Sequence, residues 1–516
     1  MKLPRPTPAT VERIAGIALV VVMVAVIARA GRIQPGDGSH FISIEMRLAD
    51  LLRDLEVGRF ARFWLTLVAP HPPLGYLPGI AAFFLLGHTP LAHVLAGGLA
   101  AWLVVDGLLR LGDGRGLAAA LAFTASPMVW LAVEGHGRDL AAAACAVQAV
   151  SWLHASAGFQ RRRQAMAFGA WLGAGFLVKY TFPMFMILVC LGAAVHLRSK
   201  ARWHNLGAAI AAFALVAGGW WAVMGHNALA YLGANMGSNA GAEAKLLTWA
   251  ERMAPEHLSM YPLALKDALG WPGIVALAAG AWWAPKLPLA GALGGLAVLA
   301  IQSQAQDRYA LPALALACGA AVSLGRSTLG SLAALVVFAP LYVTSAVAFS
   351  PAAHTATTST YQHPLTTWSR VSWPGSRTYN PIALQLGGWH LERPLAALRE
   401  AQGRDDGTVG LLLSTGGGVP EFGTVVMSAQ YLGYRWDYAN VVPRGPGRTD
   451  VFVGPLFDGA WPSKEFTALL ALQCPGPDHA QGEWLAAFDG QQTAAFDLPS
   501  GCAGSVWSLQ AAPSGG

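Results

Sequence analysis

Long apolar runs recur between residues 11 and 349, and they constrain the fold more than any other feature. A helix needs roughly 20 mostly apolar residues to cross the ~30 Å hydrocarbon core of a bilayer. Only 12% of the residues are charged, about half of the roughly 25% that soluble domains carry. The pattern therefore predicts an all-α polytopic membrane domain over residues 1–350.

The apolar runs divide into about eleven predicted membrane helices. The first, from about Val11 to Ala30, lacks a small-residue cleavage site, which predicts a signal anchor that stays in place. The other predicted spans are 89–111, 116–133, 139–157, 166–178, 180–197, 206–224, 270–284, 287–301, 310–325 and 329–349.

Positive charges predict the orientation of these spans. Lys2 and Arg5 place the N-terminus in the cytoplasm. The run 74–86 is too short to cross, so we expect a second interfacial or re-entrant helix on the outer side. A crossing there would move Arg161, Arg162 and Arg163 outside, against the positive-inside rule. The net charge of +6 thus indicates topology rather than a nucleic-acid partner.

The outer segment 31–88 between the first two spans carries the first candidate residues. Asp37 follows the first span, and 41–58 predicts an amphipathic helix on the membrane surface, with Glu45 on its polar side. His71 precedes Pro72-Pro73, which forces an extended corner. His71 is then a hydrogen-bond donor to substrate or a structural cap on that corner.

Two aspartates are candidate catalytic residues. Asp37 is either a solvated loop residue or a general base for an acceptor hydroxyl. Asp139 starts a predicted span, where it either complements the helix dipole or positions the acceptor, a metal or the Asp37 loop. Glu134 and His136 could join Asp139 as metal ligands, but their irregular spacing is a weak signal, and no metal site is predicted.

Two cations fall at the same predicted outer face. Lys179, followed by Tyr180, lies in a very short turn between two spans, and Arg308-Tyr309 precedes Leu311-Pro312. Each cation could be a side chain that reaches the interface. Together they could stabilise the charge that develops on a lipid-phosphate leaving group.

Beyond residue 350 no membrane-length run occurs, and residues 351–516 predict an α/β domain outside the cytoplasm. The expected elements are strands at Thr408–Leu413 and Asp450–Val453 and a helix at Pro420–Leu432. Cys474 and Cys502 form either a disulfide or two free thiols.

Several motifs, in this order, resemble the GT-C superfamily of lipid-phosphate-sugar glycosyltransferases. The pattern is most like the protein O-mannosyltransferase family (glycosyltransferase family 39) and its bacterial relatives, the lipid A aminoarabinose transferases. The shared elements are Asp37, His71-Pro72-Pro73-Leu74-x-Tyr76, Phe84-Leu85-Leu86-Gly87, Ser126-Pro127 before Asp139, Lys179-Tyr180-Thr181 and Arg308-Tyr309-x-Leu311-Pro312.

The resemblance implies a polyprenyl-phosphate-linked sugar donor and an inverting single displacement on the outer face of a bacterial inner membrane. Asp37 would be the base, Asp139 the second acidic position, and Lys179 and Arg308 would lie near the donor phosphate. No cofactor is required, and a divalent cation stays open. The family often has Asp-Glu where this chain has Asp37-Gly38. If the second carboxylate is essential, either Glu45 would have to substitute for it or the activity is altered.

The acceptor stays open among lipids, glycans and proteins. Two other functions compete with transfer. A non-catalytic membrane scaffold would need no active carboxylate, and a transporter or flippase would show internal repeats and helices broken at mid-membrane.

Overall fold

The computed structural model describes most of the helical part of the chain and a smaller share of the C-terminal part. The described residues are 7–30, 37–67, 72–135, 138–195, 197, 200–237, 253–283, 285–300, 307–350, 392–403, 408–413, 425, 437–443, 449–453, 468–473, 490–497 and 503–508.

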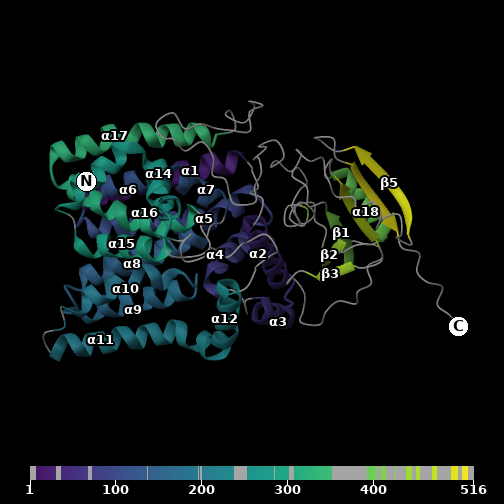
Figure 1. Ribbon diagram of the computed structural model, residues 1–516, viewed down its shortest axis with the longest axis horizontal. Helices are drawn as coiled ribbons and strands as arrows, with labels where there is room; N and C mark the ends of the chain where they lie inside the picture. Colours follow the sequence, from purple (N-terminus) through teal and green to yellow (C-terminus); the bar gives the residue numbers. More distant parts are fainter. Residues whose placement is uncertain are drawn as a thin grey trace, which may run out of the picture.

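Helices account for nearly all of the structure before residue 350 (Figure 1). Their bounds are α1 Pro8–Ala30, α2 Asp37–Arg53, α3 Val57–Leu67, η1 Pro73–Gly75, α4 Leu77–Leu86, α5 Pro90–Leu111, α6 Leu117–Ala125, α7 Pro127–Glu134, α8 Arg138–Ala155, α9 Arg162–Phe176, α10 Phe182–Ala194, α11 Lys200–Phe213, η2 Ala214–Gly218, α12 Gly219–Gly237, α14 Pro255–Ala281, α15 Lys286–Ala300, η3 Asp307–Ala310, α16 Leu311–Cys318, η4 Gly319–Arg326 and α17 Thr328–Ala348.

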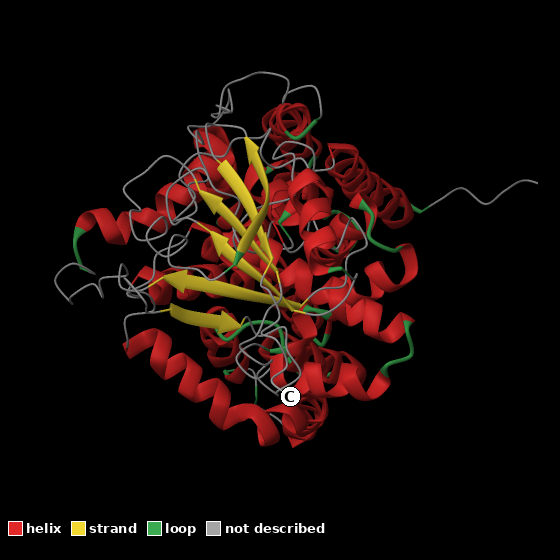
Figure 2. Ribbon diagram, turned by 90° about the vertical axis from the view of Figure 1, so that its right-hand side faces the viewer, coloured by secondary structure: helices red, strands yellow, loops and turns green. Residues whose placement is uncertain are grey.

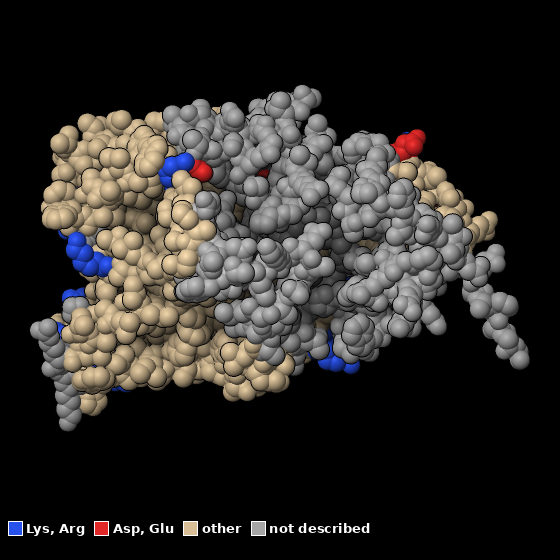
Figure 3. Space-filling model, viewed as in Figure 1, with Lys and Arg blue, Asp and Glu red and all other residues tan. Residues whose placement is uncertain are grey.

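Five helices in the described part of the chain are long and apolar enough to cross a membrane, and a bent pair makes a sixth. These are Pro8–Arg29, Leu91–Leu111, Arg202–Leu229, Tyr261–Ala281 and Thr328–Ala348, with α6 and α7 as the pair. The other predicted spans correspond to shorter helices, among them α8, α9, α10, α15 and α16. Charged side chains are sparse on the helical body (Figure 3). The chain is an integral membrane protein, as predicted.

The predicted span 116–133 consists of two helices, α6 and α7. The chain bends by 69° between α6 and α7. Ser126 at the junction is extended (φ −69°, ψ 124°), and Pro127 starts α7. Proline disfavours the helical conformation of the residue before it, so α6 ends there and α7 starts in a new direction.

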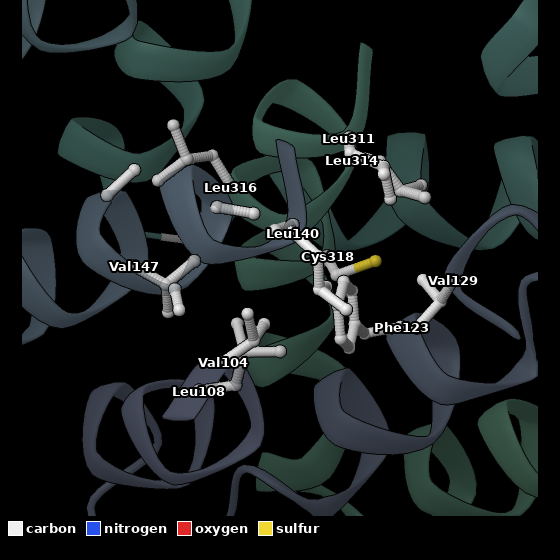
Figure 4. Close-up of a cluster of buried hydrophobic side chains, with 14 of the residues drawn as sticks. Val104, Leu108, Phe123, Val129, Leu140, Val147, Leu311, Leu314, Leu316 and Cys318 are labelled. Carbon is white, nitrogen blue, oxygen red and sulfur yellow. The ribbon is translucent and has the colours of Figure 1, made fainter. Parts of the chain in front are cut away.

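The membrane domain packs around small and branched apolar side chains. One buried cluster contains Val104 and Leu108 of α5, Leu140 and Val147 of α8 and Leu314 of α16, together with residues of α6 and α7 (Figure 4). Alanine and glycine recur between them, and such small side chains let helix backbones approach closely. This core fixes the ends of α8 and α16, which carry candidate site residues.

The predicted surface helix 41–58 is two helices, which corrects the sequence interpretation. Leu55 takes a positive φ of 59° and separates α2 from α3. Leu55 is 81% exposed, although the prediction placed it on the apolar face. Glu45, predicted on the polar side, is buried, because α4 packs against α2. Helix α2 is thus part of the packed body rather than a helix lying on a surface.

Helices occupy both ends of segment 225–269, which lies between two predicted spans. Helix α12 continues to Gly237, and α14 begins at Pro255.

Three of the predicted cytoplasmic turns meet at one end of the helices. The Glu12 carboxylate of α1 accepts a hydrogen bond of 2.8 Å from the Gly116 amide. Gly325, at the end of η4, lies so close to the Arg115 carbonyl that a Cβ would sit 2.2 Å from its oxygen. The turns before α6 and before α17 therefore share the end at which α1 begins.

The C-terminal part contains a six-stranded sheet with helix α18 (Glu392–Gln402) packed on it (Figure 2). Its strands are β1 Thr408–Leu413, β2 Asp437–Pro443, β3 Thr449–Val453, β4 Ala468–Gln473, β5 Gln491–Asp497 and β6 Ala503–Ser508, in the order β3-β2-β1-β4-β6-β5. β1 pairs in parallel with β2 and β4, with Val409 opposite Tyr438 and Ala468, and the outer pairs are antiparallel. The predicted α/β class is confirmed. Cys474 and Cys502 lie outside the described residues, as does the predicted helix 420–432 except for Val425.

Candidate functional site

Asp139 and Lys179 form an ion pair at the end of the helices opposite to the turns that the sequence predicts to be cytoplasmic. Asp139 is in the first turn of α8, and Lys179 is in the turn between α9 and α10. The Lys179 ammonium donates to Oδ1 of Asp139. Side-chain exposure is 5% for Asp139 and 20% for Lys179. The Asp139 side chain is therefore almost fully shielded from water, and that of Lys179 is partly exposed.

Tyr309 completes this contact from a third element. Its ring centre lies 4.2 Å from Nζ of Lys179, within the distance at which an aromatic face attracts a cation. Tyr309 lies in η3, directly before α16. Asp139 of α8 and Tyr309 of η3 thus both contact the ammonium group of Lys179 in the α9–α10 turn. All three residues were chosen from the sequence.

Arg138, next to Asp139, makes a second cation–aromatic contact. Its guanidinium carbon lies 3.7 Å from the Phe41 ring centre and 3.9 Å from that of Tyr76. These rings come from α2 and from the residue after η1, and they meet edge to face. Arg138 is only 8% exposed. It links the start of α8 to the segment that begins at Asp37.

Glu45 lies beneath this cluster and is fully enclosed. A Cβ at Gly79 of α4 would fall 1.9 Å from Oε2 of Glu45, so a glycine is needed there for the carboxyl group to fit. Burial raises the pKa of Glu45 well above its usual value near 4.5, and the positive charge of Arg138 opposes part of that rise. Burial thus favours the neutral acid form of Glu45.

A backbone hydrogen bond fixes the predicted proline corner against the Lys179 turn. The Leu74 amide donates to the Leu177 carbonyl oxygen at 2.8 Å. Pro72 is extended (φ −60°, ψ 140°), and Pro73 opens η1. The corner expected from Pro72-Pro73 is confirmed, and it holds Tyr76 close to Arg138.

The structure describes only some of the remaining predicted site residues. Asp37 is the first residue of α2, one helical turn before Phe41, and Arg308 precedes Tyr309 in η3; for both, the structure describes the backbone. His71 lies outside the described residues. The ring of Tyr180 points to α12, with its centre 6.2 Å from that of Trp221, rather than to the Asp139–Lys179 pair.

Within the described residues, no three His, Cys, Asp or Glu side chains come close enough together to hold a metal ion. Glu134, one of the three ligands considered from the sequence, ends α7, and its carbonyl oxygen lies 2.7 Å from Nε2 of His93. His136, the second, lies outside the described residues, and Asp139, the third, is paired with Lys179.

The sequence interpretation missed Arg138, Phe41 and Tyr76 as a contacting group. One signal was available, since Arg138 precedes a candidate aspartate at a helix start. The aromatic partners lie 97 and 62 positions upstream in the sequence, and no periodicity connects positions so far apart.

The fold and this site define a class: a polytopic helical membrane protein with an α/β C-terminal part and a charged, aromatic-lined site at one end of its helices. The chain is similar to two crystal structures of ArnT from Cupriavidus metallidurans, one in the apo state and one bound to undecaprenyl phosphate. Both give a TM-score of 0.58 at 15% identity, covering 97% of this chain and 98% of ArnT in the first case and 96% and 97% in the second. No family model and no curated protein sequence matches the chain. The fold predicted from the resemblance is confirmed.

Proposed function

We propose that the protein is an inverting glycosyltransferase that moves a sugar from a polyprenyl-phosphate donor to a lipid, glycan or protein acceptor. The observation that carries this proposal is the convergence of Asp139, Lys179 and Tyr309 at one end of an ArnT-like fold. One of the ArnT crystal structures contains undecaprenyl phosphate. A polyprenyl phosphate is therefore the donor lipid that we assign to this chain.

In the proposed reaction, Asp37 accepts the proton of the acceptor hydroxyl at the start of α2. The hydroxyl oxygen forms a bond to the anomeric carbon while the bond from that carbon to the phosphate oxygen breaks. The leaving lipid phosphate takes the bonding electron pair. A single displacement of this kind inverts the configuration at the anomeric carbon.

Lys179 and Arg308 stabilise the charge that develops on the leaving phosphate. Asp139 acts through Lys179, because its ion pair fixes the position of the ammonium group. Tyr309 covers the same ammonium on a second side and leaves fewer orientations open to it. His71 and Tyr180 complete the proposed substrate contacts, His71 as a donor at the proline corner.

The proposed topology places this chemistry on the outer face of a bacterial inner membrane. The N-terminus is cytoplasmic, and residues 351–516 form a domain outside the cytoplasm. The turns that carry Arg115 and Arg326 lie together with the N-terminal end of α1, which supports a single cytoplasmic end for these positive charges.

Sugar transfer tests the proposal. The purified full-length protein in liposomes receives a panel of radiolabelled polyprenyl-phosphate sugars, with a membrane extract as the acceptor source. We expect label to move from one donor of the panel to acceptor material. If the protein binds none of the donors and moves no label, transfer is wrong and a non-catalytic membrane scaffold becomes the better account.

A further inference from the structure

The described arginine and lysine side chains in the interior of the membrane domain differ in whether they have a counter-ion. Lys179 is paired with Asp139, and Arg110 is paired with Asp106 and also donates to Gln148. Arg138 is 8% exposed, and within the described residues no carboxylate oxygen lies within ion-pair distance of it. Unlike Lys179 and Arg110, Arg138 is therefore a buried cation without a carboxylate partner among the described residues.

Two nitrogens of Arg138 also have no hydrogen-bond partner within the described residues. Its Nε and Nη2 atoms are buried, and no acceptor in the described part of the chain contacts them. Buried polar groups almost always have a hydrogen-bond partner, and a native exception calls for an explanation such as a ligand. These two nitrogens lie on one edge of the guanidinium plane, which is the edge that takes the two oxygens of a phosphate or carboxylate.

The surroundings of Arg138 fix this edge in place. The rings of Phe41 and Tyr76 lie 3.7 and 3.9 Å from its guanidinium carbon, and Gly75 lies against the side chain so that a Cβ would be 3.6 Å from Cδ. Glu45 offers little compensating charge, because burial raises the pKa of its carboxyl group and favours the neutral acid. The guanidinium is thus pre-organised by aromatic faces and keeps an unmatched positive charge.

We propose that Arg138 binds a phosphate oxyanion of a substrate through Nε–H and Nη2–H, while Phe41 and Tyr76 hold the guanidinium plane. This inference rests on the proposed function and extends it by a recognition residue. The phosphate belongs either to the donor lipid or to an anionic acceptor; the chemistry at Arg138 is the same, and the experiment separates the two.

The first arm measures lipid binding by the full-length protein in nanodiscs. Undecaprenyl phosphate is compared with undecaprenol, which lacks the phosphate. The variants are Arg138→Met, which keeps an unbranched stem between the rings, and Arg138→Lys, which keeps the charge and loses the planar fork. Arg163→Gln, an exposed arginine at the far end of α9, is the matched control. Thermal midpoints identify any variant that does not fold, and the ratio of phosphate to alcohol affinity is taken on monodisperse protein only.

A donor role predicts that Arg138→Met lowers the phosphate-over-alcohol preference by roughly 10-fold to 100-fold, as loss of hydrogen bonds to a charged group does. The phosphate-over-alcohol preference of Arg138→Lys should then lie between those of the wild type and Arg138→Met, and that of Arg163→Gln should equal that of the wild type. The second arm measures transfer to a phosphorylated lipid acceptor and to its dephosphorylated form. An acceptor role predicts unchanged undecaprenyl phosphate binding and a KM raised roughly 10-fold for the phosphorylated acceptor alone.

Unchanged lipid binding together with unchanged KM values in folded Arg138→Met would overturn the inference and leave the proposed function intact. A wild-type protein that binds no undecaprenyl phosphate and transfers no sugar would overturn both.

Discussion

Asp139 and Lys179, 40 positions apart in the sequence, form an ion pair in which the aspartate side chain is almost fully enclosed and the lysine side chain is partly exposed. The pair joins the start of α8 to the turn between α9 and α10. Because the ammonium group also touches the Tyr309 ring, its position depends on three separate elements. An ammonium held in this way is suited to meet a charged group without a large loss of side-chain entropy.

Replacing one member of this pair removes an ionic partner from the other. We expect Lys179→Met to lower the stability of the protein by about 3–5 kcal/mol, because the Asp139 carboxylate loses its counter-ion in an enclosed site. The double variant Lys179→Met with Asp139→Leu should recover part of that loss. Thermal unfolding of the two singles and the double in one detergent measures the coupling between the residues. Additive effects would contradict the ion pair.

The Tyr309 ring stabilises the ammonium of Lys179 through its face rather than through its hydroxyl. Tyr309→Phe should therefore retain transfer close to that of the wild type. Tyr309→Leu removes a cation–aromatic contact of roughly 0.5–2 kcal/mol and should lower kcat/KM by roughly threefold to 30-fold. Steady-state kinetics of both variants test the contact. Equal losses of kcat/KM in Tyr309→Phe and Tyr309→Leu would assign the role to the hydroxyl group instead of the ring face.

Gly79 makes room for the buried Glu45 carboxyl. We expect Gly79→Ala to destabilise the protein by about 1–3 kcal/mol, because its Cβ would overlap the Glu45 side chain and force α2 away from α4. Gly58→Ala in α3 is the matched control, since nothing lies within 4 Å of its Cβ position. Alanine there should be neutral or stabilising by up to about 1 kcal/mol. The measurement is the thermal unfolding midpoint of Gly79→Ala, compared with that of Gly58→Ala.

Glu45 makes stability depend on pH in a direction that can be measured. Its folded-state pKa is raised, so above the unfolded-state pKa the folded protein binds more protons than the unfolded one. Stability is therefore highest at low pH and falls as pH rises through the interval between the two pKa values, by up to about 1.4 kcal/mol per pH unit. Glu45→Gln removes this term. We expect the thermal midpoint of the variant to gain on that of the wild type from pH 5 to pH 8. Parallel curves would show that Glu45 ionises normally.

The helices were predictable from the sequence because their signal is local. Apolar length and the Pro72-Pro73 corner identified α1, α5, α17 and η1 within a few residues. The break at Leu55 was not predictable, because a positive φ at a leucine has no local sequence signal. Glu45 was misplaced for a related reason: a polar side chain on a helix face indicates solvent unless the partner helix is known, and that partner is α4.

The site was predictable in part. Asp139 was chosen because polar groups at this membrane depth are costly to keep, Lys179 because it lies in a very short turn between two spans, and Tyr309 because it follows Arg308. The structure brings these three together. Arg138 was not chosen, since its role depends on Phe41 and Tyr76, whose rings reach it only through the packing of α2 and η1 against α8. Contacts of this kind follow from tertiary packing rather than from sequence spacing.

The central claim is that Asp37 is the base of a sugar transfer at the start of α2. The most direct measurement is the rate of label transfer from the preferred polyprenyl-phosphate sugar by wild type and by Asp37→Asn, with Asp54→Asn, just after α2, as control. We expect a loss of roughly 100-fold or more in kcat for Asp37→Asn, with its thermal midpoint and its binding of undecaprenyl phosphate unchanged, and normal activity for Asp54→Asn. Transfer at the wild-type rate by folded Asp37→Asn would contradict the account.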